Sequence, residues 1–473
     1  MYLEFGNIQG LPDNEREKIR ELEKVFNYHF SKNLEKNKYY EGHIPLSEVN
    51  LGIALPKSMK NLEVGCEWGA KAVDVLAARS MFDGFVKSNG YPADEMNRIS
   101  NDNNLLTEYM KACRDELKYG CTFATLSKDP VKGCKIRFHS PASAAALWNG
   151  EKGRIDCGLA IIDTKKDESD INYKPSLINY YTDDAIYVLR NSEKNAWTAV
   201  KYPNKMGRPL MEALVWNATT SKPFGRSRIK ESIRRLIQGY VRTVANATVA
   251  LEFATSPQKY ILGVTDEQYD AITNEKFNQY IGSILAATTN PETGSNPVFG
   301  QLSQGTLSPH VEMLRLLATQ FSAATGLSST DTGVISEANP SSSDAIIAQT
   351  QTLITLAEQL NASNGEALKR IALMAQAVAK NETLSELDDE ELSIVAHFKN
   401  PAMPSVSSTA DAAVKIASAR PAFANTDIYL EMVGFDIADV RRIKSQETRQ
   451  RGLALADKLD AQAEAVPEPG DEE

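Results

Sequence analysis

The stretch PFGRSRIKESIRRLIQGYVRTVANATVALEFATSPQKYILGV, Pro223–Val264, decides the fold. Apolar side chains recur in it at helical spacing: Ile229, Ile233, Leu236, Tyr240, Val244, Ala247 and Leu251. We expect Ser227 to cap a helix that ends near Ala254, which spans about 42 Å at 1.5 Å per residue. The strand-like Lys259–Val264 follows directly. The stretch therefore predicts a long amphipathic helix that leads into a small, separate unit.

The segments downstream of this stretch complete that unit and return from it. A helix near Glu267–Leu285, a Gly/Pro/Asn loop and the strand-like Val298–Leu302 precede Pro309. Pro309 opens a helix that carries Leu314, Leu317, Phe321 and Ala324 on one face. Two helices with a compact unit between them predict an elongated subunit. A lone elongated subunit would expose much apolar surface, so we expect neighbouring copies to cover it.

A polar loop and a third helix follow. Gly326–Asn339 contains two glycines and many hydroxyl side chains, which predicts a loop. Ser341 and Asp344 resemble a capping box with Asp in place of Glu. The helix they open carries apolar residues from Ile347 to Val378 and would run about 55 Å if Gly365 does not break it.

The regions before and after these three helices differ from them in amino-acid pattern. We expect N-terminal helices, then a meandering sheet interrupted by one short helix, and after the long helix a short strand, two more helices and a disordered acidic tail. The expected helices are Asn14–Leu34, Asn61–Phe82, Asn104–Lys118, Ala142–Trp148, Thr409–Ala419 and Ile437–Leu459. The expected strands are Cys121–Leu126, Cys134–His139, Ile155–Asp163, Ile178–Tyr181, Ala185–Leu189, Ala196–Tyr202 and Leu392–Phe398.

The amino-acid composition limits the classes of protein to which the chain can belong. The chain has 473 residues, enough for two or three domain-sized units, and 52 basic against 62 acidic residues give a net charge of −10. An acidic balance disfavours tight DNA binding, although it allows a conduit through which DNA slides. Five cysteines without a CxxC pair predict free, mostly buried thiols in a reducing compartment and no zinc site. The sequence shows neither a signal-peptide pattern nor an apolar run long enough to span a bilayer, so we expect no membrane association.

Sequence motifs for catalysis are missing. The chain contains no GxxxxGK[ST], HExxH, GxSxG or EF-hand motif, so we expect no catalytic residue, metal or cofactor. Asp183 and Asp184 could bind a cation, but a simple turn is the favoured interpretation. The strongest positive feature is the basic cluster Arg226, Arg228, Lys230, Arg234, Arg235 and Arg242. It is either a basic belt near DNA or a solvated helix face that pairs with acids of a neighbouring subunit, and the sequence leaves both open.

Four stretches together resemble the portal proteins of tailed phages of the siphovirus type. They are Tyr39–Gly42 with Leu51–Pro56, Pro223–Ile229, Ser256–Gly263, and Leu307–His310 continuing through Gly326–Leu327 to Asn339–Ser342. The order of the elements from Asn14 to Arg449 and the inserted unit add to the likeness. Portal proteins form a ring at one vertex of the viral head through which double-stranded DNA enters and leaves.

The resemblance implies an α+β, mainly helical, elongated subunit with wing, stem, clip and crown regions. It assigns residues 1–224 to the wing, 225–255 and 309–325 to stem helices, 256–308 to the clip and 326–340 to the tunnel loop. Residues 341–400 would form the long helix and the wing return strand, 401–460 the crown helices, and 461–473 the disordered tail. The DNA-facing loop residues would be Ser328, Ser329, Thr330, Asp331, Thr332 and Gly333, and a possible stem belt would comprise Lys230, Arg234, Arg235 and Arg242.

The resemblance also implies partners and a location. The chain would assemble with itself into a ring of twelve and meet DNA weakly and without sequence preference. It would contact the terminase motor, the major capsid or scaffold protein and a head-completion adaptor. It would reside at the head vertex of the virion, and in the host cytoplasm during assembly. The alternatives are a head adaptor or scaffold-type structural protein and, less favoured, a nucleic-acid-processing metalloenzyme.

Overall fold

The computed structural model describes most of the chain. The described residues are 2–45, 63–88, 90–166, 173–192, 196–255, 259–267, 270, 289, 294, 296–301, 306–328, 330–333, 343–402, 406–435 and 437–464. Two compact units divide the chain, Met1–Lys399 and Asn400–Glu473. The predicted helix near Glu267–Leu285 and the capping box at Ser341 lie largely outside the described residues.

The first unit contains two main sheets. The larger has the strand order β1-β11-β10-β9-β8-β7, and the smaller has the order β12-β5-β6. Their strands are β1 (Ile8–Gln9), β5 (Cys121–Asp129), β6 (Gly133–His139), β7 (Ala144–Asn149), β8 (Arg154–Lys166), β9 (Tyr173–Tyr181), β10 (Ala185–Ser192), β11 (Ala196–Pro203) and β12 (Met211–Val215). All pairs are antiparallel except β1 with β11. The strands predicted between Cys121 and Tyr202 are thus confirmed.

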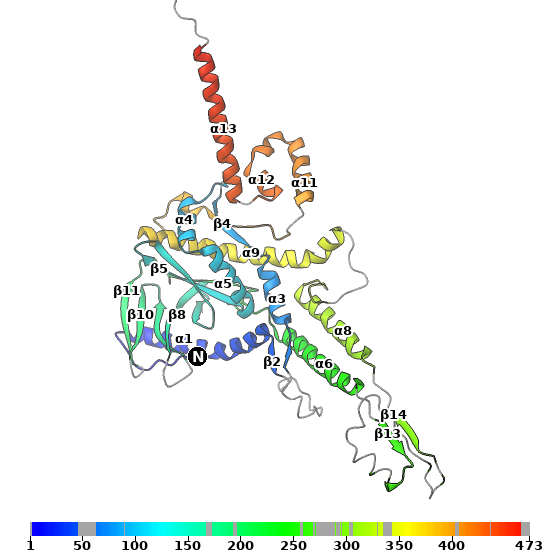
Figure 1. Cartoon of the computed structure of the whole chain (residues 1–473). Coiled ribbons are helices and arrows are strands. Elements are labelled where there is room, and N and C mark those ends of the chain that lie inside the picture. The colour runs from blue at the N-terminus through cyan, green and yellow to red at the C-terminus, as the bar shows by residue number, and fades with distance from the viewer. Residues whose placement is uncertain are drawn as a thin grey trace, which may run out of the picture. The chain divides into compact units, whose positions relative to one another are not determined.

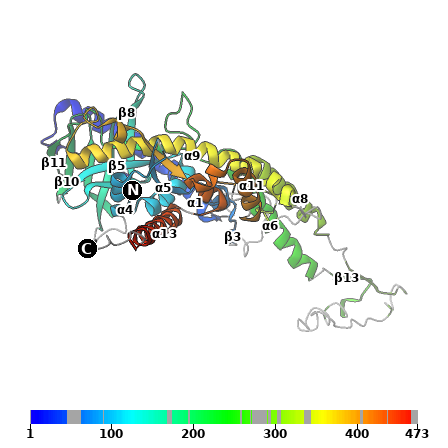
Figure 2. The ribbon, with the colours of Figure 1, turned by 90° about the horizontal axis from the view of Figure 1, so that it is seen from above.

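Some helices of the first unit lie against these sheets, and others, such as α6 (Glu231–Thr255) and α8 (Ser308–Thr325), extend away from them (Figure 1). The other described helices are α1 (Asp13–Glu41), α3 (Trp68–Ala77), α4 (Asp94–Asp102), α5 (Leu105–Tyr119), α9 (Ser343–Lys380) and α10 (Asp389–Leu392). Helix α1 buries Ile19, Leu22 and Phe26 against the larger sheet. Helix α9 runs over the smaller sheet, as Figure 2 shows from above. Gly365 does not break it, so the condition on which the sequence predicts one long helix is met. The α+β, mainly helical class is confirmed.

Among the described residues of the first unit there are also three small two-stranded sheets. Strand β15 (Ile394–Phe398) pairs with β4 (Phe82–Lys87), so the chain returns after α9 to a strand more than three hundred positions earlier. Strand β13 (Lys259–Leu262) pairs with β14 (Val298–Gln301) beyond the ends of α6 and α8, and β2 (His43–Pro45) pairs with β3 (Glu63–Gly65). The strands predicted at Lys259, Val298 and Leu392 are confirmed to within a few residues.

The second unit is helical. It contains α11 (Val406–Ala419), the short 3-10 helix η2 (Pro421–Asn425), α12 (Asp427–Val433) and α13 (Ile437–Glu464). The helices predicted at Thr409 and Ile437 are confirmed. Because α13 continues through Glu464, residues 461–464 are helical and the predicted tail boundary at 461 is wrong; residues 465–473 lie outside the described part. Every helix among the described residues is too short or too polar to cross a membrane.

The predicted helix at Ala142–Trp148 is wrong, since this segment forms strand β7. Ala144 and Ala146 belong to one buried cluster, whereas Ala145 belongs to the other. A strand places successive side chains on opposite faces, so only a strand can serve two cores in this way. Tertiary packing therefore overrides the helix propensity of the alanines.

The predicted helix at Asn61–Phe82 is correct only in its middle, where α3 lies. Gly65 ends strand β3 and Phe82 begins strand β4. The partner of β4 is β15, which no local pattern around residue 82 reveals. The core of α3 is confirmed by its buried Ala72, Val73 and Leu76.

Candidate functional site

The candidate site is the turn that follows α8, within the predicted tunnel loop. Its foundation is the packing of α6 against α8, which lie side by side in Figure 1. Gly239 permits this close approach, because a Cβ atom there would lie 3.2 Å from Leu317 Cδ2. Trp68 of α3 contacts both helices, with ring centroids 4.6 Å from Tyr240 and 4.7 Å from Phe321. The base of the turn is therefore firmly packed.

The buried stripe of α6 differs from the predicted one. Ile233, Ile237, Val241 and Ala245 are fully buried, at a strict spacing of four residues. The prediction placed Val244 and Leu251 on the buried face, but Leu251 is 49% exposed. Helix α6 begins at Glu231 rather than at Ser227, whose Oγ accepts from Ile229 N at 2.9 Å and donates to the Lys118 carbonyl.

A glycine in the left-handed region ends α8. Gly326 has φ 73°, and its N–H donates to the Ser322 carbonyl at 2.9 Å. Ser322 Oγ donates to the carbonyl of Leu327, whose side chain is buried. Only glycine adopts such a φ without strain, so Gly326 fixes the direction in which the chain leaves the helix.

One carboxylate organises the turn itself. Asp331 Oδ2 accepts hydrogen bonds from Ser328 N at 3.1 Å and from Ser328 Oγ at 2.7 Å. Gly333 N donates to the Thr330 carbonyl at 3.1 Å, which closes the turn with Thr330 exposed. Lys71 Nζ of α3 donates to the Asp331 carbonyl. The turn is thus a polar, hydroxyl-bearing projection whose base is tied to α3.

Arg228 holds the same region from the other side. Its Nε donates to the Ala72 carbonyl of α3, and its guanidinium donates to the Thr325 carbonyl at 2.6 Å. The Thr325 carbonyl lies at the C-terminal end of α8, where a positive charge is favoured by the helix dipole. Burial lowers the pKa of Arg228 to about 10, so the side chain is charged at neutral pH. This buried cation joins α3, the segment that leads into α6 and the end of α8.

The predicted loop residues do not share one environment. Ser328 and Asp331 are partly buried and bonded to each other, Thr332 is buried, and Thr330 and Gly333 are exposed. Ser329 and residues 334–340 lie outside the described part. Among the described members, only Thr330 and Gly333 are freely presented to a passing ligand.

The predicted basic belt is partly neutralised by acids of the same chain. Arg234 pairs with Glu35 of α1 and with Glu231, and Arg235 Nε lies 3.1 Å from Glu231 Oε1. Lys230 is exposed and Arg242 is partly exposed. The pairing interpretation therefore applies to two of the four residues, although their acids come from their own subunit rather than from a neighbour. Whether Lys230 and Arg242 face DNA stays a prediction.

The acids considered for a metal form ion pairs instead. Asp183 Oδ2 lies 2.7 Å from Lys152 Nζ and 3.4 Å from Arg154, and Asp184 lies 3.2 Å from Lys201 Nζ. Within the described ranges no three His, Cys, Asp or Glu side chains gather as a metal site would require. The five cysteines are free and buried, as predicted.

Sequence reasoning missed the two cations that fix the turn. Arg228 was grouped with an exposed basic cluster, and Lys71 was not singled out. The sequence does contain a signal that Arg228 is buried, because this residue lies between Ser227 and Ile229 in a segment that precedes the helix. The sequence contains no such signal for Lys71, because its partner, Asp331, lies 260 positions away.

The chain is similar to a known protein family and to several solved structures. Residues 13–446 match the family model described as phage portal protein, SPP1 Gp6-like. No curated protein sequence matches the chain. A structure titled "Virion of native gene transfer agent (GTA) particle" is similar with 10% identity and a TM-score of 0.47, covering 85% of this chain and 93% of that one. "Neck of native GTA particle computed with C12 symmetry" is similar with 12% identity and a TM-score of 0.44, covering 83% and 98%.

Proposed function

The chain belongs to the phage portal protein family of the SPP1 Gp6-like type, and from this membership we propose that it forms the ring-shaped DNA channel at one vertex of a viral head. In this role it nucleates head assembly, admits DNA during packaging, releases it during ejection and joins head to tail. The observation that carries the proposal is the family match, which extends from the start of α1 into α13.

The regions of the subunit follow from this proposal. The sheets with α1, α3, α4 and α5 form the wing, α6 and α8 form the stem, and the β13–β14 hairpin belongs to the clip. The turn after α8 belongs to the tunnel loop, α9 lies behind it, and the second unit forms the crown. The family is structural rather than enzymatic, so we expect no nucleotide hydrolysis or DNA cleavage by the chain alone.

The proposed contact with DNA is weak. Residues 326–333 contain no lysine or arginine, and the one acid, Asp331, accepts its hydrogen bonds within the turn. Thr330 offers a hydroxyl that can touch a phosphate without holding it. A weak wall suits a channel, because each strong phosphate contact adds a barrier to sliding. We expect binding without sequence preference that moderate salt removes.

The proposed partners are further copies of the chain in a ring of twelve, the terminase motor, the capsid or scaffold protein and a head-completion adaptor. The proposed location is the virion, with assembly in the host cytoplasm. The two other candidates have less support. Ion pairing of Asp183 and Asp184 argues against a metalloenzyme built on these acids, and the hairpin between α6 and α8 argues against a simple adaptor.

Negative-stain imaging of the purified chain tests the proposal. We expect rings with a central hole, whose abundance rises with protein concentration because assembly follows mass action. Particles of monomer size at all concentrations would contradict the proposal and favour an adaptor. Metal-dependent DNA cleavage that persists through purification would favour the enzyme.

A further inference from the structure

A cavity of about 530 Å³ lies between α1 and the segment that leads into α6. Its apolar wall includes Phe26 of α1, Phe123 of β5 and Phe224. This volume lies within the range of about 300–1,000 Å³ that is typical of specific ligand sites. The cavity is separate from the turn after α8, and the proposed function gives it no role.

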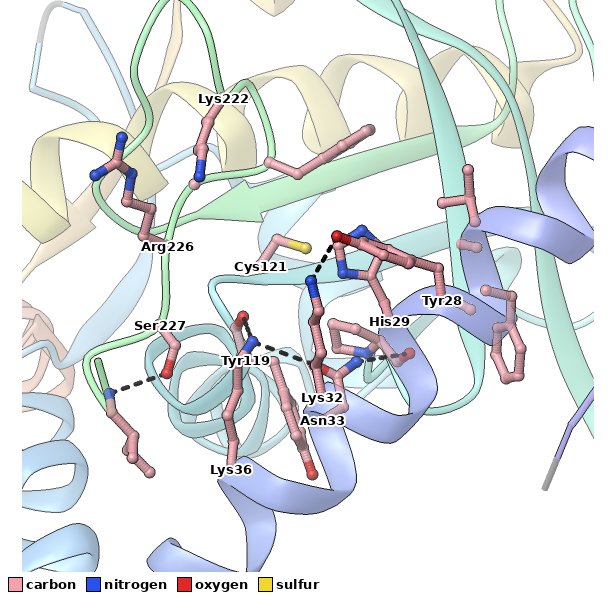
Figure 3. Close-up of a pocket in the computed structure, with 18 of the residues that line it drawn as sticks. Tyr28, His29, Lys32, Asn33, Lys36, Tyr119, Cys121, Lys222, Arg226 and Ser227 are labelled. Carbon is pink, nitrogen blue, oxygen red and sulfur yellow. Dashed lines mark hydrogen bonds between the residues drawn. The ribbon is translucent and has the colours of Figure 1, made fainter. Parts of the chain in front are cut away.

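The rim of the cavity is strongly basic. Lys32 and Lys36 come from α1, and Lys222 and Arg226 come from the opposite segment (Figure 3). Lys230, from the same segment, also lines the cavity. Arg234 also lines the cavity, but its charge is matched by Glu35 and Glu231. Among the described residues, none of the other five cations forms an ion pair with an acid. Five unneutralised positive charges around one cavity are unexpected in a chain with a net charge of −10.

The two cations on α1 are held in place by uncharged groups. Lys32 Nζ donates to Tyr28 Oη at 2.6 Å, and Lys36 Nζ donates to the Tyr119 carbonyl at 2.9 Å. They are i, i+4 neighbours, so their charges repel each other in the empty cavity. Burial, followed by the charges of Lys36 and Lys32, lowers the pKa of His29 beside them. An anionic group would relieve this repulsion.

We propose that this cavity docks an acidic peptide segment of a partner protein, with carboxylates at the basic rim and an aromatic or aliphatic side chain against the phenylalanines. The charge complementarity is strong, because the cavity is lined by six cations and one acid, Glu231, and such an excess of one sign concentrates the field on its occupant. The apolar wall favours a peptide over DNA, because the phosphates of a duplex reach the rim only and leave the wall uncovered. The proposal does not rest on ring formation or on DNA passage.

Direct binding to the full-length chain tests the proposal. The probe is a fluorescein-labelled twelve-residue peptide of Glu and Asp with central Phe and Leu, studied by fluorescence anisotropy. We expect saturable binding that weakens at least about tenfold in Lys32→Glu with Lys222→Glu, since each reversal replaces attraction with repulsion. Both residues are exposed and lack acidic partners in the described structure, so the variants should fold.

The controls separate this site from general charge attraction. Lys24→Glu changes an exposed lysine on the same helix outside the cavity, and it should leave binding unchanged. A peptide with Ser in place of Phe and Leu should bind at least about tenfold more weakly, because it lacks the apolar anchor. Equal binding of that peptide, or equal loss in Lys24→Glu, would overturn the proposal.

Two further outcomes would assign the cavity differently. In one outcome, a random-sequence DNA duplex competes with the peptide, and this competition disappears in the variant with Lys32→Glu and Lys222→Glu. The cavity would then be a phosphate site. Binding to monomers but not to assembled rings would assign the cavity to a neighbouring copy of the chain. Either result would overturn the proposal while leaving the portal function intact.

Discussion

Arg228 is the residue on which the geometry at the base of α8 most depends. Its guanidinium donates hydrogen bonds to two carbonyls on different helices. The ammonium group of a lysine lacks the forked, planar geometry that reaches both carbonyls. We expect Arg228→Lys to lower the free energy of unfolding by about 2–4 kcal/mol, because a buried charge and two carbonyls lose partners. Denaturant unfolding measures this loss. Arg226→Lys, at an exposed neighbouring position, is the matched control and should change stability by less than about 0.5 kcal/mol.

We expect Glu116 to make the stability of the fold depend on pH. It is fully buried between α5 and α9, where Asn364 Nδ2 donates to its Oε2 at 2.8 Å. Burial raises its pKa to about 8, whereas the ordinary value is 4.5. The folded state thus binds a proton more tightly than the unfolded state. Its stabilising contribution is complete below pH 4.5 and disappears as the pH rises through 8.

We therefore expect Glu116→Gln to gain stability relative to the wild type as the pH rises, by about 1–3 kcal/mol at pH 8. Glutamine keeps the size of the side chain and cannot ionise. Unfolding midpoints between pH 5 and 9 measure the difference. Glu17→Gln, at an exposed site on α1, should leave the pH profile unchanged. Parallel profiles for the wild type and Glu116→Gln would show that this carboxyl is not the titrating group.

Single residues were only partly predictable from the sequence. The burial of all five cysteines follows from their type and irregular spacing, and the structure confirms it. The burial of Arg228 and the tie from Lys71 to the Asp331 carbonyl depend on contacts across 97 to 260 positions. Such contacts leave no periodic trace in the sequence.

At the scale of elements, two glycines should respond oppositely to the same substitution. Gly365 lies within α9, and a Cβ atom there would meet only Phe398 Cε2 at 3.7 Å, an ordinary contact. We expect Gly365→Ala to stabilise the protein by about 0.5–1 kcal/mol through helix propensity. Gly326→Ala should destabilise it, because φ is 73° and the new atom would lie 3.0 Å from Thr352 Cγ2. Thermal unfolding of both variants measures the signs, and equal signs would contradict this account of the helix ends.

The proposed role of the tunnel loop can be tested without disturbing the packing of α6 and α8. Thr330→Ala removes an exposed hydroxyl, and Gly333→Ala strains a backbone with φ 79°. Neither residue lies in the packed faces of α6 and α8. We expect both variants to assemble normally and to alter DNA packaging or retention, which quantification of packaged DNA in assembled heads measures. Thr198→Ala on β11 should behave like the wild type, and normal packaging by both loop variants would show that the DNA-facing element lies elsewhere.

Elements were predictable wherever one face of a helix or strand is buried by local neighbours. Most strands from Cys121 to Tyr202 follow from their β-branched and aromatic residues and the turn clusters between them, and the apolar stripe of α9 follows from its helical periodicity. Strand β7 was missed because alanines carry no β signal, and β4 was missed because its partner β15 lies far along the chain. The buried stripe of α6 was misplaced because both of its sides carry apolar residues.

At the scale of the whole molecule, net charge and local charge serve different purposes. The chain is acidic overall, which limits adhesion to a polyanion, yet it concentrates cations around one cavity beside α1. The turn after α8 carries hydroxyls and no lysine or arginine. This division is consistent with both proposals, a channel through which DNA slides and a separate cavity that docks an acidic protein segment.

We propose that copies of this chain form a ring whose channel is lined by the turn after α8. Cryo-electron microscopy of the assembled full-length chain, with residues 326–333 located in the density, measures this most directly. We expect a closed ring with a central hole, with the turns from all subunits at its inner wall. A ring in which these turns face outward, or particles without a ring, would contradict it.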